Sequence, residues 1–197
     1  MSALFNIPYG LYVLTAKDGK DNGCIINTLQ QVTSSPTQIS ITINKDNLTT
    51  KMIQKTSVFN VSILDKTATF DLIKTFGFSS GKSTNKFENF KDCKVAKNRV
   101  LYITQSTNSF LSAKVVSQID VGTHITFIAE ITEDKIINET ESLTYDHYLK
   151  NIKPKPAEKA NNSYICKICG YIYEGEELPQ DFICPICKHG SEVFEKK

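Results

Sequence analysis

The chain of 197 residues lacks three features that would assign it to a common class of protein. No stretch approaches the ~18 apolar residues that a membrane span requires, and the N-terminus has no basic head followed by an apolar run. The net charge of +2 is too small for a nucleic-acid binder. Neither Gly-x-Gly-x-x-Gly nor Gly-x-x-x-x-Gly-Lys-Ser/Thr is present, so any nucleotide site must be built differently. We therefore expect a cytoplasmic protein that contacts neither membrane nor nucleic acid.

Only six cysteines are present, and four of them form two Cys-x-x-Cys pairs near the C-terminus: Cys166 with Cys169, and Cys184 with Cys187. Four thiolates in a tetrahedron suit zinc or iron, and only iron can carry an electron. The gap between the pairs is slightly shorter than the ~15–20 residues of a four-cysteine zinc ribbon, so a structural zinc stays open. The remaining Cys24 and Cys93 are expected to be isolated thiols.

The residues around these cysteines add a second pattern, which includes Gly170, Pro185 and the aromatic residues Tyr164, Tyr171, Tyr173, Phe182 and Phe194. Together they resemble rubredoxin. The resemblance implies one iron ion held by Cys166, Cys169, Cys184 and Cys187, with the aromatic residues screening it from water. Gly170 permits a positive φ beside the metal. Lys188 stands where a second glycine usually follows, and the loop between the pairs is shorter than in free-standing rubredoxins.

The boundary between this module and the rest of the chain is visible in the composition. The segment that includes Pro154 and Pro156 is polar and has no periodicity, which favours a semi-extended linker. We predict a main domain at 1–149, a linker at 150–163 and a metal-binding domain at 164–197. A tether of this kind would hold the module near the main domain at an effective concentration on the order of millimolar.

The main domain is predicted to be mainly β, with short inserted helices. Its expected strands are rich in β-branched residues and bounded by turn signals, and two helices are expected over Leu48–Lys55, capped by Asn47, and over Thr69–Phe76, ended by Gly77 in a left-handed conformation. Many short strands point to a small barrel. The expected strands are Leu11–Thr15, Cys24–Thr33, Ile39–Ile43, Val58–Leu64, Leu111–Ile119 and Thr123–Ile131.

Five motifs occur in order along the main domain: Tyr9-Gly10-Leu11-Tyr12-Val13, Asn27 to Pro36, Ile43 to Thr49, Phe76 to Lys82 with Lys86-Phe87, and Gly122 to Glu130. Together they resemble the flavin reductase and flavoredoxin family, whose fold is an FMN-binding split β-barrel. The resemblance spans roughly residues 5–149. It implies that FMN is bound and that two such barrels pair as a homodimer.

The resemblance also implies roles for individual residues. The strand at Asn27, Thr28, Leu29, Gln30, Gln31 and Thr33 would lie along the isoalloxazine ring. The helix start at Asn47, Thr49 and Thr50 would receive the phosphate, with Asn44, Lys45 and Lys51 beside it. The loop Ser79, Ser80, Gly81 and Lys82 would wrap the phosphate or the ring edge. His124 would lie near the flavin as a catalytic residue. Each of these residues also has an ordinary structural interpretation, as a solvated strand, helix or loop residue.

Joining the two resemblances gives a mechanism that neither supplies alone. A nicotinamide delivers two electrons as one hydride, a four-thiolate iron takes one electron at a time, and a flavin can do both. We expect electrons to pass from NAD(P)H through FMN to iron, and then to an acceptor such as a flavodiiron oxygen or nitric oxide reductase.

Two alternatives are carried with this hypothesis. A flavin reductase with a structural zinc ribbon would supply reduced flavin to a monooxygenase, and a non-catalytic flavin-binding module would oxidise no nicotinamide. The sequence does not choose between NADH, NADPH and a protein electron donor, and it does not name the terminal acceptor or the reduction potentials.

Overall fold

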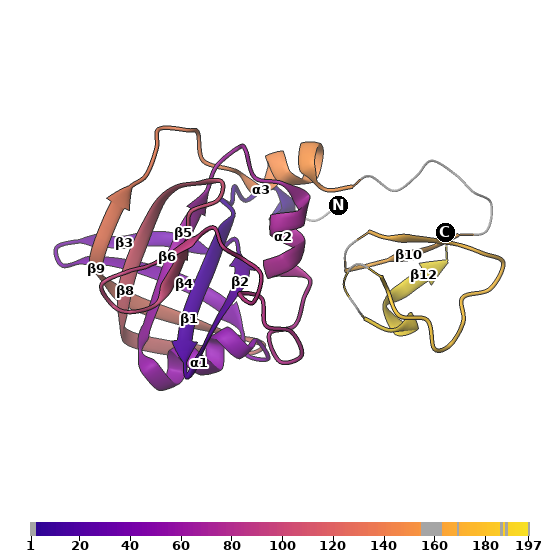
Figure 1. Ribbon diagram of the computed structural model, residues 1–197, viewed down its shortest axis with the longest axis horizontal. Coiled ribbons are helices and arrows are strands. Elements are labelled where there is room, and N and C mark those ends of the chain that lie inside the picture. Colours follow the sequence, from indigo (N-terminus) through magenta and orange to yellow (C-terminus); the bar gives the residue numbers. More distant parts are fainter. Residues whose placement is uncertain (1–2, 155–162, 169, 186, 188, 197) are drawn as a thin grey trace.

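The computed structural model describes residues 3–154, 163–168, 170–185, 187 and 189–196. Figure 1 shows a curved sheet that carries the inserted helices, with a second, much smaller sheet beside it. The main sheet has seven strands in the order β2-β1-β5-β8-β9-β4-β3, and every adjacent pair is antiparallel. The strands are β1 (Tyr12–Asp18), β2 (Lys20–Ile26), β3 (Leu29–Ser34), β4 (Thr37–Asn44), β5 (Val58–Leu64), β8 (Thr107–Asp120) and β9 (His124–Ile136).

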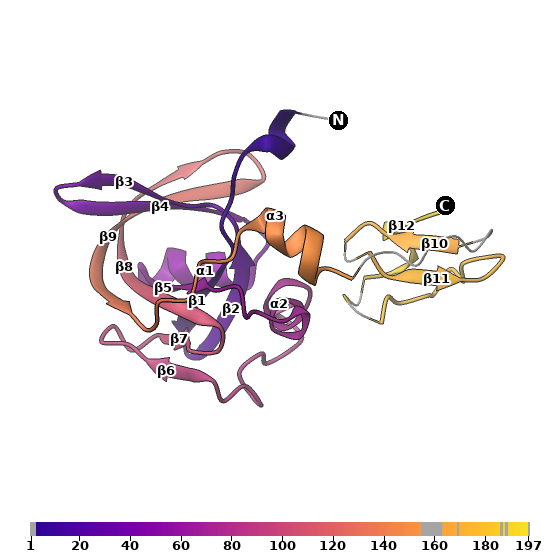
Figure 2. The same cartoon turned by 90° about the horizontal axis from the view of Figure 1, so that it is seen from above.

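The sheet curls into a split barrel, as the sequence predicted. β2 and β3 form its two edges, yet only Asn27 and Thr28 separate them in the chain. The two edges therefore lie close together at this crossing, and the curvature is visible in Figure 2. The sequence had predicted one strand over Cys24–Thr33, and this was wrong, because the chain leaves one edge at Ile26 and begins the other at Leu29.

The barrel encloses a core of alternating apolar residues. On β9, the predicted inward face is confirmed, since Phe127 and Ala129 are fully buried, Ile125 is nearly so, and Ile131 packs against the same cluster. Ile41 of the adjacent β4, and Phe59 of β5 on the far side of β8, belong to the same cluster. Burying each large side chain contributes about 1.5–3 kcal/mol, so this alternation fixes the register of the sheet.

Helix α1 (Leu48–Thr56) begins at Asn47, as predicted, but the prediction that the Asn47 side chain caps it was wrong. That side chain makes no capping hydrogen bond and instead lines a cavity. The helix buries Met52 and Ile53 and ends at Ser57, which has φ of 59° and donates its N–H to the Ile53 carbonyl. The first turn of α1 is thus left without a side-chain cap of its own.

Helix α2 (Phe70–Gly77) begins at Thr69, whose hydroxyl accepts from the N–H of Leu72. The prediction that Gly77 ends it in a left-handed conformation was wrong, because the helix continues through Gly77 and ends at Phe78 with φ of −110°. A Cβ at position 77 would lie 3.3 Å from Cγ1 of Ile25, so the glycine permits a close approach of α2 to β2.

The remaining elements are short. β6 (Cys93–Val95) and β7 (Leu101–Ile103) form a separate hairpin, and η1 (Ala3–Asn6) precedes the barrel. Beyond β9 the chain forms α3 (Tyr145–His147) and η2 (Tyr148–Ile152), so the first residues of the expected linker are helical, while 155–162 lie outside the described residues. In the part of the chain that the structure describes, no helix is both long and apolar enough to cross a bilayer.

The small sheet has the order β11-β10-β12 and is formed by β10 (Ser163–Cys166), β11 (Ile172–Glu174) and β12 (Phe194–Lys196), with η3 (Ser191–Val193) before β12. The predicted aromatic cluster is confirmed. Phe182 lies at its centre, with ring centroids 4.7 Å from Tyr173 and 5.4 Å from Phe194. Tyr171 and Tyr164 extend the cluster.

Candidate flavin cavity and metal centre

A cavity of about 730 Å³ lies against α2, at the side of the barrel where β2, the start of α1 and the loop after α2 meet. Its size is within the ~300–1,000 Å³ typical of cofactor sites. Six of the predicted binding residues line it, namely Asn47, Thr49, Ser79, Ser80, Gly81 and Lys82. Lys74, Lys82 and Lys86 outnumber the single acidic residue Asp46 in the lining, which favours an anionic ligand.

Lys86 also lines this cavity, and the sequence assigned it no role. Its side chain is only 7% exposed, and its ammonium group donates to the carbonyls of Gly23 at 2.8 Å and Phe76 at 3.0 Å. Burial lowers the pKa of Lys86 below the ordinary lysine range. An ammonium group has three donors, so a third N–H remains for a ligand beyond these two carbonyls.

Asn22 and Cys24 of β2 complete this wall, and the sequence assigned a role to neither. The Asn22 amide donates to the hydroxyl of Thr49 at 2.9 Å, which ties β2 to the first turn of α1. Burial raises the pKa of the Cys24 thiol, so it is a neutral group beside Lys86.

The sequence signal that could have identified Lys86 was its position shortly after the donor-rich loop, within the fourth motif.

Four other predicted residues line a second cavity of about 540 Å³ at the crossing from β2 to β3. These are Asn27, Thr28, Leu29 and Gln30, which face Tyr9 and Tyr12. The Thr28 hydroxyl is fixed by β4, since it donates to the Thr42 carbonyl at 2.6 Å and accepts from the Thr42 N–H. Burial raises the pKa of Tyr12, so its phenol is a hydrogen-bond donor at neutral pH.

The other predicted flavin contacts line neither cavity: Gln31, Thr33, Asn44, Lys45, Thr50, Lys51 and His124. Lys45 forms an ion pair with Asp120 at 2.6 Å, and Thr50 is fully buried with its hydroxyl on the Asn44 carbonyl. His124 lies at the start of β9, opposite Asn44, with Nδ1 2.8 Å from the Thr123 hydroxyl.

The small sheet holds a cluster of three buried cysteines. The sulfur atoms of Cys166, Cys184 and Cys187 all lie within 4.8 Å of one another, and those of Cys166 and Cys187 are 3.6 Å apart. A tetrahedron with metal–sulfur bonds of about 2.3 Å has edges of about 3.8 Å, so these thiols fit a thiolate-bound metal ion. Cys169, the fourth predicted ligand, and Lys188 lie outside the described residues.

The backbone around the cluster is held by local hydrogen bonds. Gly170 has φ of +79°, as predicted, and its N–H donates to the Cys166 carbonyl at 2.8 Å. The N–H of Cys184 donates to the carbonyl of His189 at 2.8 Å. These bonds turn each chain segment around the sulfur atoms and position the thiols before the metal binds.

Comparisons with known proteins agree with both resemblances. The family described as "Flavin reductase like domain" matches residues 4–151, and the family "Rubrerythrin, rubredoxin-like domain" matches residues 164–195. The chain is 35% identical to "High molecular weight rubredoxin" of Moorella thermoacetica, with 98% of each chain covered. It is 36% identical to "Ferric-chelate reductase (NAD(P)H)" of Archaeoglobus fulgidus, over 75% of this chain and 88% of the relative.

The solved structure of flavoredoxin from Methanosarcina acetivorans shares the fold, with a TM-score of 0.60 at 20% identity over 84% of this chain and 79% of that one. The chain therefore belongs to the flavin reductase like family and carries a rubredoxin-like domain at its C-terminal end. It is an oxidoreductase. The first domain implies a flavin, and the second implies iron bound through the cysteine cluster.

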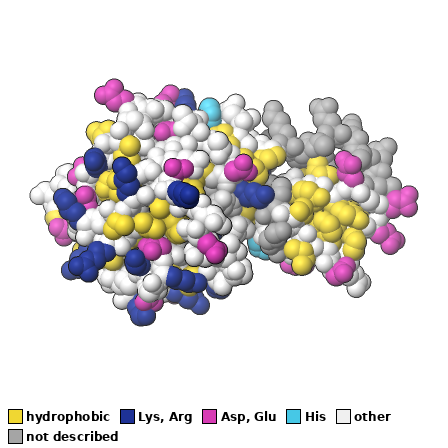
Figure 3. All heavy atoms as spheres, in the orientation of Figure 1, with side chains coloured by type: hydrophobic (Ala, Val, Ile, Leu, Met, Phe, Trp, Pro, Cys, Tyr) yellow, Lys and Arg dark blue, Asp and Glu magenta, His cyan; other side chains and the backbone are white. Residues whose placement is uncertain are grey.

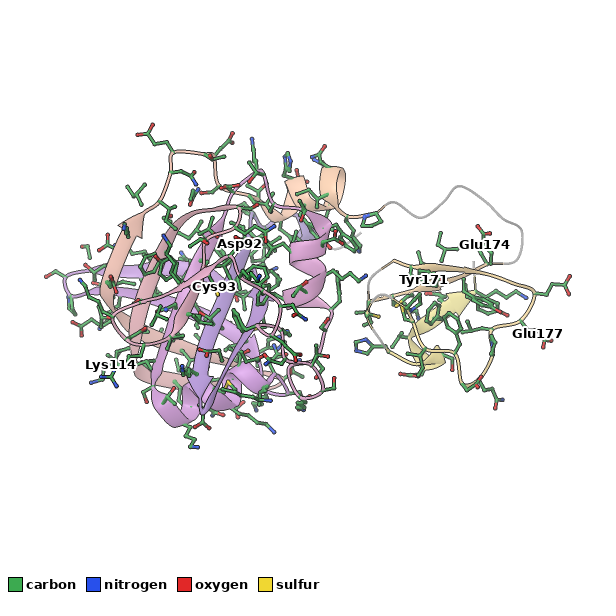
Figure 4. All side chains as sticks on the ribbon, viewed as in Figure 1. Asp92, Cys93, Lys114, Tyr171, Glu174 and Glu177 are labelled. Carbon is green, nitrogen blue, oxygen red and sulfur yellow. The ribbon has the colours of Figure 1, made fainter. Side chains whose placement is uncertain are left out.

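Replacing Cys184 by serine removes a soft ligand from the cluster, and we expect it to abolish the iron charge-transfer absorption and the bound iron. The matched control is Cys93→Ser, because Cys93 lies on β6 of the main domain, next to Asp92 and away from the cluster (Figure 4). Metal analysis and visible spectra check the prediction. Flavin binding is expected to survive in both variants, and its loss in Cys184→Ser would contradict the division at 150–163.

Proposed function

We propose that the chain passes electrons from NAD(P)H through FMN to an iron ion at Cys166, Cys169, Cys184 and Cys187, and then to a separate acceptor protein. The observation that carries the proposal is the position of Cys187, which lines the same cavity as Lys86 and the start of α1. A metal centre that borders the flavin cavity is in a position to exchange electrons with the flavin, whereas a zinc ribbon that serves only structure would not need this position. The two relatives, a high molecular weight rubredoxin and an NAD(P)H ferric-chelate reductase, support the proposal.

The flavin phosphate is proposed to bind between Lys86 and the start of α1. The free N–H groups of the first turn of α1 lack a side-chain cap, and they carry the positive end of the helix dipole. Thr49 is held toward this place by Asn22. Lys86 adds a full charge in a low-dielectric wall, where its attraction for a phosphate is strong.

The isoalloxazine ring is proposed to lie toward the β2–β3 crossing, near Asn27 and Thr28. When bound, the flavin accepts a hydride and releases electrons singly. The backbone at Asn27 and Thr28 provides donors and acceptors for the ring edge, and the Thr28–Thr42 hydrogen bonds fix its position. His124 lines neither cavity, so we propose no contact between His124 and the flavin bound to the same chain.

The terminal acceptor is proposed to be a protein with a basic surface, of the flavodiiron reductase class. The support is the charge of the small domain, where Glu174, Glu176 and Glu177 are exposed. Figure 3 shows acidic side chains on the outer edge of this domain, and Figure 4 places Glu177 at the end away from the barrel. Opposite charge would steer a basic partner to this side.

The proposal is tested by metal analysis together with an anaerobic NADH titration of the purified chain. We expect one iron ion per chain, and bleaching first of the flavin band and then of the ferric-thiolate band. A chain that loads only zinc when both metals are supplied, yet oxidises nicotinamide, would be a flavin reductase with a zinc ribbon. A chain that oxidises no nicotinamide would be a binding module or would take electrons from a protein donor.

Replacing Lys86 by methionine keeps the length of the side chain and removes the buried charge. A hydrogen bond to a charged group contributes about 1.5–3 kcal/mol, so the dissociation constant of FMN should rise about ten- to hundredfold. Flavin fluorescence titration measures the change. The control is Lys66→Met, which removes a surface ion pair with Glu141. Equal FMN affinities in the two variants would place the phosphate elsewhere.

The chain is also proposed to form a homodimer. Exposed apolar side chains lie together at one end of the β8–β9 hairpin, where Val116, Ile119 and Val121 are each more than half exposed. A patch of this kind on the long hairpin suits an interface between two copies.

Replacing Ile119 by aspartate should therefore shift the chain from dimer to monomer in sedimentation experiments. Lys114→Asp, on the same strand, is the control, and an Ile119 variant that stays dimeric would exclude this surface.

A further inference from the structure

Phe78 connects the two parts of the chain. Among the described residues, it is the hydrophobic side chain of the main domain that packs against the cluster of Cys166, Cys184 and Cys187. It also packs against the barrel cluster that contains Ile73 and Phe76. Phe78 is therefore shared by two hydrophobic clusters that otherwise have no member in common.

The backbone of Phe78 is held firmly by α2. The residue is the C-cap of the helix, and its N–H donates to the Lys74 carbonyl at 3.0 Å. The centroid of its ring lies 5.9 Å from that of Phe70, the first residue of the same helix. In both Figure 1 and Figure 2, α2 lies on the side of the barrel that faces the small sheet. This arrangement presents a fixed ring to the small domain.

The small domain contributes residues next to Cys184 and Cys187 to the wall of the cavity beside α2. Pro185, Cys187 and His189 line the cavity beside Phe78. A second cavity borders Cys166, and Leu149 of the main domain lines it together with Lys153 and Gly170. Cys187 and Cys166 thus each border a cavity that a residue of the main domain also lines, and the exposed Glu176 and Glu177 line neither cavity.

We propose that the small domain docks in cis on Phe78, with its cysteine cluster against the flavin cavity, and that Phe78 is the positioning residue for electron transfer within one chain. This inference rests on the proposed function. With flavin and iron bound, the first transfer would move one electron from the fully reduced flavin to the ferric ion, which becomes ferrous, and the second would move the remaining electron; one flavin proton would leave to solvent with each electron. A one-electron acceptor protein reoxidises the iron before the second electron follows.

Transient absorption after laser-flash photoreduction of the flavin, with EDTA as the sacrificial electron donor, tests the proposal, because it starts from reduced flavin without a nicotinamide. In Phe78→Ala, transfer would depend on chance encounters of a tethered domain, and the rate of ferric bleaching should fall at least about fivefold. Phe78→Leu, which keeps an apolar contact, should recover most of the rate. Phe90→Ala is the matched control, since its ring packs on Phe76 but not on the cysteine cluster.

Small-angle scattering of the same proteins gives a readout that needs no electron transfer. The radius of gyration should rise in Phe78→Ala, as the small domain leaves the barrel, and should stay at the wild-type value in Phe78→Leu and Phe90→Ala. Wild-type rates and dimensions in Phe78→Ala would overturn the inference and leave the proposed function standing. Ferric iron that never bleaches in the wild-type chain would overturn the proposed function itself.

Discussion

The antiparallel pairing of β8 with β9 is the constraint on which both cavities depend. The hairpin spans Ser109 to Ile136, and its register shifts twice, between Ser112 and Ala113 and between Val115 and Ser117. Each shift bends the strands and increases their twist. β8 can therefore pair with β5 while β9 pairs with β4, and the two edges of the sheet are brought to the single crossing at Asn27 and Thr28. Without this curvature, α1 and α2 would not meet around β2.

The cavity beside α2 is polar where an ordinary core would be apolar. A buried ammonium group is costly unless it is hydrogen-bonded or paired with an anion. Lys86 has two carbonyl acceptors. Burial lowers its pKa, and no carboxylate acts against this effect. Binding an anion would offset the remaining cost and would raise the pKa of Lys86 again. The uncapped first turn of α1 has the same preference, so two independent groups in the cavity wall favour an anionic ligand.

The sequence predicted what depends on local pattern and missed what depends on contacts between distant segments. The spacing of Cys166, Cys184 and Cys187 and the alternation along β9 are local, and both were found in the structure. The crossing at Asn27 was missed, because a continuous run of β-formers hides a change of edge. Lys86 was not assigned a role: its place in the fourth motif marked it, but its burial results from the contact of α2 with β2, which the sequence around position 86 does not report. Gly77 was misread as a helix end for the same reason, since its small size serves the approach to Ile25.

The charges of the two domains differ, and they suit the two kinds of partner that the proposed function requires. The cavity is positive, through Lys74, Lys82 and Lys86, and so attracts anionic cofactors, whereas the outer edge of the small domain is acidic. An acceptor drawn to the acidic edge would therefore bind on the side opposite Phe78, and its docking need not displace the small domain from the barrel. The iron would then lie between donor and acceptor in a single assembly. In that geometry the chain between η2 and β10 would keep the two domains together, and the proposed Phe78 contact would set their orientation.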